Sequence, residues 1–185
     1  METRDIYELR YSYKKQERPI VDFSLPENGR KVSWSLIGQI LEDKAPTGLY
    51  KPVHLVVKEA NATEWDTYSA AGTYGLMSQR AVALVGDSMT LCFEFLEAYI
   101  NEAPYFLLKP TGHLDCLDYD KSDIVYWDID PYNIKTIKHC SFHKQQIPEA
   151  IVFRLPDWHG LFATAPIKAM IDKAGLKGFC FFDTE

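Results

Sequence analysis

Alternating apolar and polar positions recur along most of this sequence and predict a chain rich in β-strands. Residues 6–11 and 21–25 alternate in this way, and the second run stops at a turn signal, Pro26-Glu27-Asn28-Gly29. Later runs contain the β-branched and aromatic residues that favour strands. Residues 61–75 are polar and contain glycine, and no strand is assigned to them. Further strands are expected at residues 53–57, 91–100, 105–109, 114–119, 124–127, 134–137, 151–155 and 178–182, the last one buried, with a turn at residues 130–133.

Helical spacing of apolar residues appears in three segments, each with a capping residue at its start. Strands joined mostly by short turns, with few helices, favour an α+β fold: a largely antiparallel sheet with about three short helices packed on it. No repeat or linker-like segment interrupts the pattern, so residues 1–185 are expected to form a single domain. The expected helices run from Ser33 or Ser35 to about Asp43, from Ser78 to Gly86, and from Thr164 through Pro166 to Gly175.

Composition and charge narrow the classes of function. The chain has 185 residues, of which 46% are hydrophobic, and a formal net charge of −6. This charge disfavours binding to nucleic acid or anionic membrane and suits a basic protein partner. No apolar run approaches the roughly 20 residues of a membrane span, and the N-terminus lacks a signal-peptide pattern, so a cytoplasmic location is expected. Cys92, Cys116, Cys140 and Cys180 are widely spaced, which favours buried free thiols.

The sharpest local feature is a run of carboxylates in which Lys121 is the only basic residue. Three interpretations are open: a ridge that attracts a basic partner, a calcium or magnesium site, and a solvated strand edge whose charges discourage edge-to-edge pairing. The run lacks the glycine and the terminal glutamate of an EF-hand loop. The carboxylates are Asp115, Asp118, Asp120, Asp123, Asp128 and Asp130.

Histidines and cysteines offer weaker candidates for chemistry. His139, Cys140 and His143 lie within five residues of each other, and His113 with Cys116 forms an H-x-x-C pair. Zinc sites usually combine two such clusters, but this pairing has no recognised spacing. The alternative is a partly buried strand that carries polar side chains.

His159 follows Asp157 and Trp158 in a loop before the last helix. His159 either acts as a general base with Asp157 nearby, or it is a turn residue without a catalytic role beside a tryptophan that anchors the loop. The motifs G-x-S-x-G, G-x-G-x-x-G and G-x-x-x-x-G-K-[ST] do not occur. The sequence therefore contains no complete catalytic or nucleotide-binding motif, which favours a protein that works by binding.

Aromatic residues in turn-like segments are candidates for interface anchors. Aromatic side chains are core material first, but they also anchor many protein interfaces. Trp65, Tyr68, Tyr132 and Trp158 are the better interface candidates, and acidic neighbours around Trp127 argue against RNA stacking.

Ordered segments in the second half of the chain carry a family resemblance. They are residues 76–81, 93–96, 105–108, 114–118 with Ser122, 151–155, and 167–179. In the order and spacing of these segments the chain resembles the immunity proteins of bacterial polymorphic-toxin systems, in the group once filed as a domain of unknown function and linked to myxobacterial-type toxin loci. The resemblance covers residues 75–183 and leaves residues 1–70 as a variable N-terminal part. It implies a cytosolic antitoxin that blocks a cognate toxin domain by binding and has no enzymatic activity.

Three hypotheses of function follow, and the third and least specific of them is a small-molecule-binding domain with an apolar cleft lined by the aromatic residues. The first is an immunity protein that binds a toxin with a basic surface, needs no cofactor or metal, and binds neither nucleic acid nor membrane. The second is a small metal-dependent or hydrolytic enzyme that uses His139, Cys140, His143 and His159. The oligomeric state is left open. The expected partner-binding residues of the first hypothesis are Asp115, Asp118, Asp120, Asp123, Asp128, Asp130, Trp127, Tyr132 and Trp158.

Overall fold

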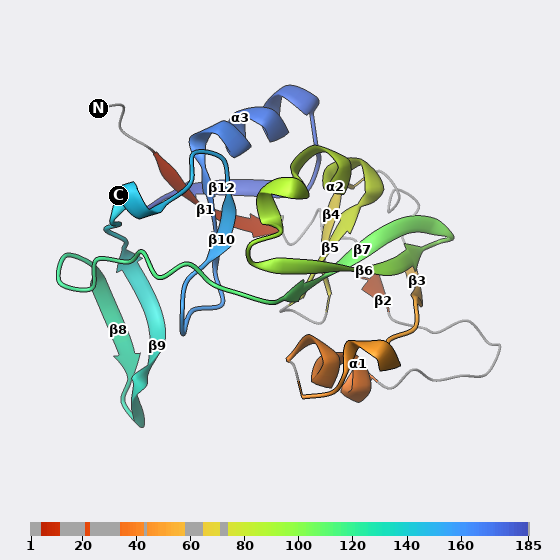
Figure 1. Ribbon diagram of the computed structural model, residues 1–185, viewed down its shortest axis with the longest axis horizontal. Helices are drawn as coiled ribbons and strands as arrows, with labels where there is room; N and C mark the ends of the chain where they lie inside the picture. Colours follow the sequence, from red (N-terminus) through yellow and green to blue (C-terminus); the bar gives the residue numbers. More distant parts are fainter. Residues whose placement is uncertain are drawn as a thin grey trace.

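The computed structural model describes residues 5–11, 21–22, 34–42, 44–57, 65–70 and 74–184, which form two β-sheets, a separate hairpin and three helices (Figure 1). Of the strand pairs in this described part, only β3 with β6 is parallel, which confirms a largely antiparallel α+β fold. The helices are α1 (Trp34–Leu41), α2 (Gln79–Val85) and α3 (Ala165–Ala174). The strands are β1 (Ile6–Tyr11), β2 (Val21–Asp22), β3 (Val53–Val57), β4 (Thr67–Ala70), β5 (Tyr74–Ser78), β6 (Phe93–Ile100), β7 (Ala103–Pro110), β8 (Asp123–Trp127), β9 (Asp130–His139), β10 (Val152–Arg154), β11 (Leu161–Thr164) and β12 (Phe179–Asp183).

The first sheet, in the order β10-β11-β1-β12, brings together strands from both ends of the described chain. β1 pairs with β11 on one side and with β12 on the other, and α3 packs against β11. Phe153 of β10 and Phe162 of β11 stack with their ring centroids 5.5 Å apart, and Phe142 meets both rings edge-on. All three rings are buried, so they form the centre of the first hydrophobic core.

The second sheet, in the order β2-β3-β6-β7-β5-β4, has its own core. Ile37, Ile40 and Leu41 of α1 are buried in it, as the helical spacing predicts. α2 contacts β5 and β7 of this sheet and also α3 of the first, so it links the two halves of the fold.

The helix ends follow the capping residues of the sequence. The Ser78 hydroxyl accepts a hydrogen bond of 3.1 Å from the Ala81 amide at the start of α2. Gly175 ends α3 in the left-handed conformation, with φ 61° and ψ 38°. Thr164 occupies the N-cap position of α3, but its hydroxyl instead accepts from the Ile151 amide at 3.2 Å. That hydrogen bond joins the start of α3 to the residue before β10, and it does not cap the helix.

Several expected strands differ from the structure. Residues 114–119 form only an isolated bridge between Leu117 and Phe142, because their backbone bonds are divided between Arg154 and Ser141. The expected turn at residues 130–133 is wrong, because Trp127 pairs with Asp130 at the end of the hairpin and the turn consists of residues 128–129. β12 is an edge strand and only partly buried, so the expected buried strand is also wrong.

Three strands have no counterpart in the sequence prediction. β4 lies within the polar stretch 61–75 and pairs with β5, which begins at the end of that stretch and continues to Ser78. Tyr68 of β4 is a buried core residue with only 3% of its surface exposed. The third strand, β11, consists of only the four residues Leu161–Thr164 between the loop of His159 and α3. The expected turn at residues 26–29 and the alternative cap Ser33 lie outside the described residues.

The four cysteines are free thiols, as expected. Cys92, Cys116 and Cys140 are buried, whereas Cys180 is only partly buried. Burial raises the pKa of the Cys116 thiol to about 12 and that of Cys140 to about 11, so both stay protonated at neutral pH. In the described part of the chain, no helix has the length and apolar character needed to cross a membrane.

Candidate partner-binding site

The hairpin of β8 and β9 stands apart from both sheets (Figure 1). Its two strands pair with each other and with no other described strand, and three register shifts interrupt their pairing. At its base, the Asp118 amide donates to the Ser141 carbonyl, and the Cys140 amide donates to the Thr184 carbonyl. The hairpin is therefore anchored at one end and projects from the body at the other.

Large apolar side chains are exposed along this hairpin and the loop before it. Tyr119 is 44% exposed, Tyr126 39%, Trp127 48% and Ile129 94%. Among the described residues, seven large hydrophobic side chains are exposed, and these four lie within eleven consecutive positions. Such a concentration on a projecting element is typical of a protein-binding surface, because scattered single exposures are the norm elsewhere. We call these four residues the apolar finger.

The carboxylates of the sequence prediction divide into groups with different environments. Asp115, Asp120 and Asp128 are exposed and form no ion pair with another described residue. Asp123 is exposed and has Lys138 at 3.9 Å. The backbone of Asp130 begins β9, but its side chain lies outside the described part. The exposed carboxylates without an ion pair to a described residue thus lie close in sequence to the residues of the apolar finger.

Asp118 holds the loop together. Its side chain is buried, and Lys121 Nζ donates to Oδ2 at 2.7 Å, which keeps the pKa of this carboxyl below its usual value. Its carbonyl accepts from the Ser122 amide and hydroxyl, at 3.0 Å and 2.7 Å. These contacts give Asp118 a folding role in the loop that carries Tyr119.

Of the aromatic candidates Trp127, Tyr132 and Trp158, the two whose side chains are described lie in different environments. The ammonium group of Lys135 lies 5.2 Å from the Trp127 ring centroid, a cation–π distance. Trp158 packs on the first core, and its indole lies so close to Gly160 that a Cβ there would come within 2.2 Å of Nε1. The side chain of Tyr132 lies outside the described part. Trp127 is therefore the aromatic candidate that the structure places on the hairpin surface.

Electrostatics connect the hairpin with the neighbouring loop. Burial raises the pKa of Tyr119 first, and the carboxylates of Asp115 and Asp157 and the phenol of Tyr126 raise it further. These groups must lie near one another for their charges to act in this way. The loop of Asp157 thus borders the same face as Tyr119 and Tyr126.

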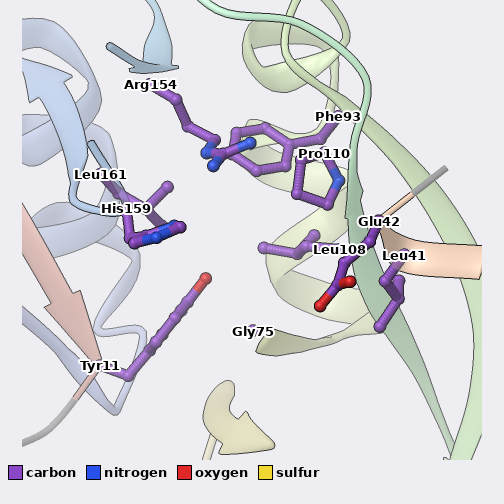
Figure 2. A pocket seen from close by; sticks show the side chains of 10 residues that line it. All are labelled: Tyr11, Leu41, Glu42, Gly75, Phe93, Leu108, Pro110, Arg154, His159 and Leu161. Atoms are coloured by element: carbon purple, nitrogen blue, oxygen red, sulfur yellow. The ribbon is translucent and has the colours of Figure 1, made fainter. Parts of the chain in front are cut away.

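The histidines and cysteines of the enzyme hypothesis lie in separate places. His139 is exposed at the end of β9, Cys140 is buried, and His143 is partly buried before a short 3₁₀ turn. His159 instead lines a cavity between the two sheets (Figure 2). Within the described residues, no group of three His, Cys, Asp or Glu side chains has a geometry that could hold a metal.

Tyr119, Tyr126 and Ile129 are the site residues that sequence reasoning missed, and Tyr126 is assigned there only to the expected strand at residues 124–127. Ile129 lies between Asp128 and Asp130, and an aliphatic residue flanked by two turn-forming carboxylates was the available signal. A strand was expected at 114–119, so Tyr119 was counted there as part of a regular element instead of an exposed loop.

Comparison with known proteins identifies the family. The model of the immunity protein family Imm11 matches residues 30–185, a range that contains all three helices, the hairpin and every strand from β3 onward. It also includes residues 75–183, on which the resemblance in the sequence rests. No curated protein matches the chain. Because the family model spans most of the sequence, the chain belongs to the Imm11 immunity protein family.

Proposed function

We propose that this protein is an antitoxin that neutralises a cognate bacterial toxin in the cytoplasm by direct binding, without catalysing a reaction. Membership of an immunity protein family supports a toxin as the partner. The observation that carries the binding mode is the apolar finger, four exposed large side chains on and beside a hairpin that pairs with no other described strand.

The finger has the composition of an interface centre. Aromatic and large aliphatic side chains contribute most of the affinity when they enter a pocket of the partner, and a polar rim excludes water around them. Trp127 and Ile129 occupy the hairpin end, Tyr126 directly precedes Trp127 in β8, and Tyr119 lies in the loop before the hairpin. A toxin with a cleft that accepts the hairpin end would bury these side chains together.

The carboxylates around the finger favour a basic toxin surface. Asp115, Asp120 and Asp128 are exposed carboxylates, so they contribute long-range attraction toward a basic surface. Charges at the rim of an interface mainly accelerate encounter and set the salt dependence, whereas the buried apolar contacts set the lifetime of the complex. The lysines at 121 and 138 pair with Asp118 and Asp123, which leaves the unpaired carboxylates to carry this steering.

Co-expression tests the proposal. The toxin encoded beside the gene is induced in bacteria with the wild-type chain or with a variant in which Trp127 and Ile129 are both serine. The wild-type chain should restore growth and co-purify with the toxin, and the variant should do neither while remaining folded. Restored growth without a stable complex would contradict neutralisation by binding. An unchanged complex in the variant would remove the finger from the interface.

A further inference from the structure

A cavity of about 490 Å³ lies between the two sheets and the C-terminal end of α1. β1, β10 and β11 of the first sheet contribute one side, and β5, β6 and β7 of the second contribute the other. Its volume is within the range of small-molecule sites. The apolar part of the lining consists of Leu41, Phe93, Leu108, Pro110 and Leu161.

Three polar side chains of the first sheet and its loop are directed into this cavity. Figure 2 shows the Arg154 guanidinium, the His159 imidazole and the Tyr11 hydroxyl pointing toward the same space. No hydrogen bond or ion pair joins the guanidinium or the phenol to another residue of the described ranges. A partly buried arginine without a partner is unusual, because removing its charge from water costs free energy that an acceptor normally offsets.

Tyr11 and Arg154 both carry protons that they can donate in hydrogen bonds to a ligand. Burial raises the pKa of Tyr11, so its hydroxyl keeps its proton. Burial lowers the pKa of Arg154, but a guanidinium remains charged in proteins. Both groups therefore present hydrogen-bond donors to the cavity, and Arg154 adds a positive charge.

Packing fixes the Tyr11 hydroxyl in position. It lies against the backbone of Gly75 in β5, where a Cβ atom would come within 1.9 Å of the phenol oxygen. Only glycine at this position leaves room for the ring, so the cavity wall is shaped for the hydroxyl.

Glu42 faces the cavity from the opposite side, at the end of α1 (Figure 2). Lys44 Nζ donates to its carboxylate at 2.6 Å, and the positive charge of the lysine partly offsets the repulsion that the carboxylate exerts on an anion. A carboxylate on this wall disfavours a dianion more than a monoanion, because the repulsion scales with the ligand's charge.

We propose that the cavity binds a small monocarboxylate with an apolar or aromatic body. Arginine donates two parallel hydrogen bonds to a carboxylate, and the Tyr11 hydroxyl and His159 imidazole lie within the same space to add further donors. Phe93, Leu108 and Leu161 offer apolar contact to the rest of the ligand. The site lies between the sheets rather than on the hairpin, so this inference does not depend on toxin binding.

Calorimetric titration of the full chain with benzoate tests the site, with benzyl alcohol and inorganic phosphate as comparison probes. Benzoate should bind at one saturable site, and it should bind more tightly than either comparison probe. Arg154→Gln should weaken benzoate at least about tenfold, the effect of one charge-assisted hydrogen bond. Tyr11→Phe should weaken it by a smaller factor and serves as the test if the Arg154 variant does not fold.

Arg10→Gln is the matched control. Arg10 precedes Tyr11 on β1, its guanidinium bonds Glu8 at 2.7 Å and lies 4.8 Å from the Phe182 ring centroid, outside the cavity lining. This variant removes the same charge and should leave benzoate affinity unchanged. Absence of saturable benzoate binding, equal affinity for benzyl alcohol, tighter binding of phosphate, or unchanged affinity in Arg154→Gln would each overturn the proposal.

Discussion

Ile129→Ser is the sharpest perturbation of the proposed interface. The side chain is 94% exposed in the free protein, so its truncation removes almost no packing and should change the free energy of unfolding by less than about 0.5 kcal/mol. Full burial of an isoleucine against a toxin contributes about 1.5–3 kcal/mol. The variant should therefore raise the Kd of the toxin complex about 10- to 150-fold while leaving the thermal transition in place.

Leu49→Ser provides the comparison for this experiment. Leu49 is 56% exposed in the 3₁₀ turn between α1 and β3, away from the hairpin, and the substitution removes a similar exposed aliphatic side chain. Binding kinetics with purified toxin and thermal denaturation of each variant are the measurements. If both variants weaken the complex equally, or if neither does, the assignment of the finger to the interface is refuted. A large loss of stability in Ile129→Ser would mean that the isoleucine side chain packs against the rest of the free protein, which would contradict its exposed position.

Three further predictions concern charge, thiols and packing. Replacing Asp120 and Asp128 together by lysine should slow toxin association and flatten its dependence on salt, as measured by stopped-flow mixing at several ionic strengths. Cys116 and Cys140 should react with iodoacetamide at pH 8 only after the chain is unfolded, because burial keeps their thiols protonated and covered; mass spectrometry of native and denatured samples checks this. Gly75→Ala should destabilise the fold by about 1–3 kcal/mol through a clash with Tyr11, seen as a lower denaturation midpoint.

Local signals predicted the elements that local interactions stabilise. α2 and α3 begin and end where Ser78 and Gly175 indicate, since capping depends on residues within one turn of the helix. β6 and β7 follow from long apolar runs and form a tight hairpin with eight paired positions. The family resemblance was also readable, because it rests on the order of such segments.

Elements stabilised by distant partners were not predictable in the same way. β4 is a short strand in a polar stretch, and the structure pairs it with β5, which itself pairs with β7 some thirty residues further along. Residues 114–119 have the composition of a strand but receive hydrogen bonds from two different segments, so no ladder forms. The strand beside which a segment can pair depends on the fold of the whole chain. The pattern of apolar residues within one segment does not reveal that partner.

The candidate site likewise combines features that the local sequence indicates with features that depend on distant residues. The carboxylate run indicated the segment that also carries the apolar finger, because charge density is a local property of the sequence. It did not separate Asp118, which is buried beside Lys121, from Asp128, which is exposed at the turn of the hairpin. The cavity brings together Arg154 and Tyr11, which lie more than 140 residues apart, and no local pattern in the sequence indicates that these two meet.

Hydrogen–deuterium exchange of the toxin complex tests the central claim most directly. Amide exchange is compared for the free chain and for the chain saturated with its toxin, with the hairpin followed in peptides that span residues 119–139. The account predicts that toxin slows exchange in residues 119–130 more than in any other described segment. Unchanged exchange across the hairpin, with protection confined to another surface, would contradict it.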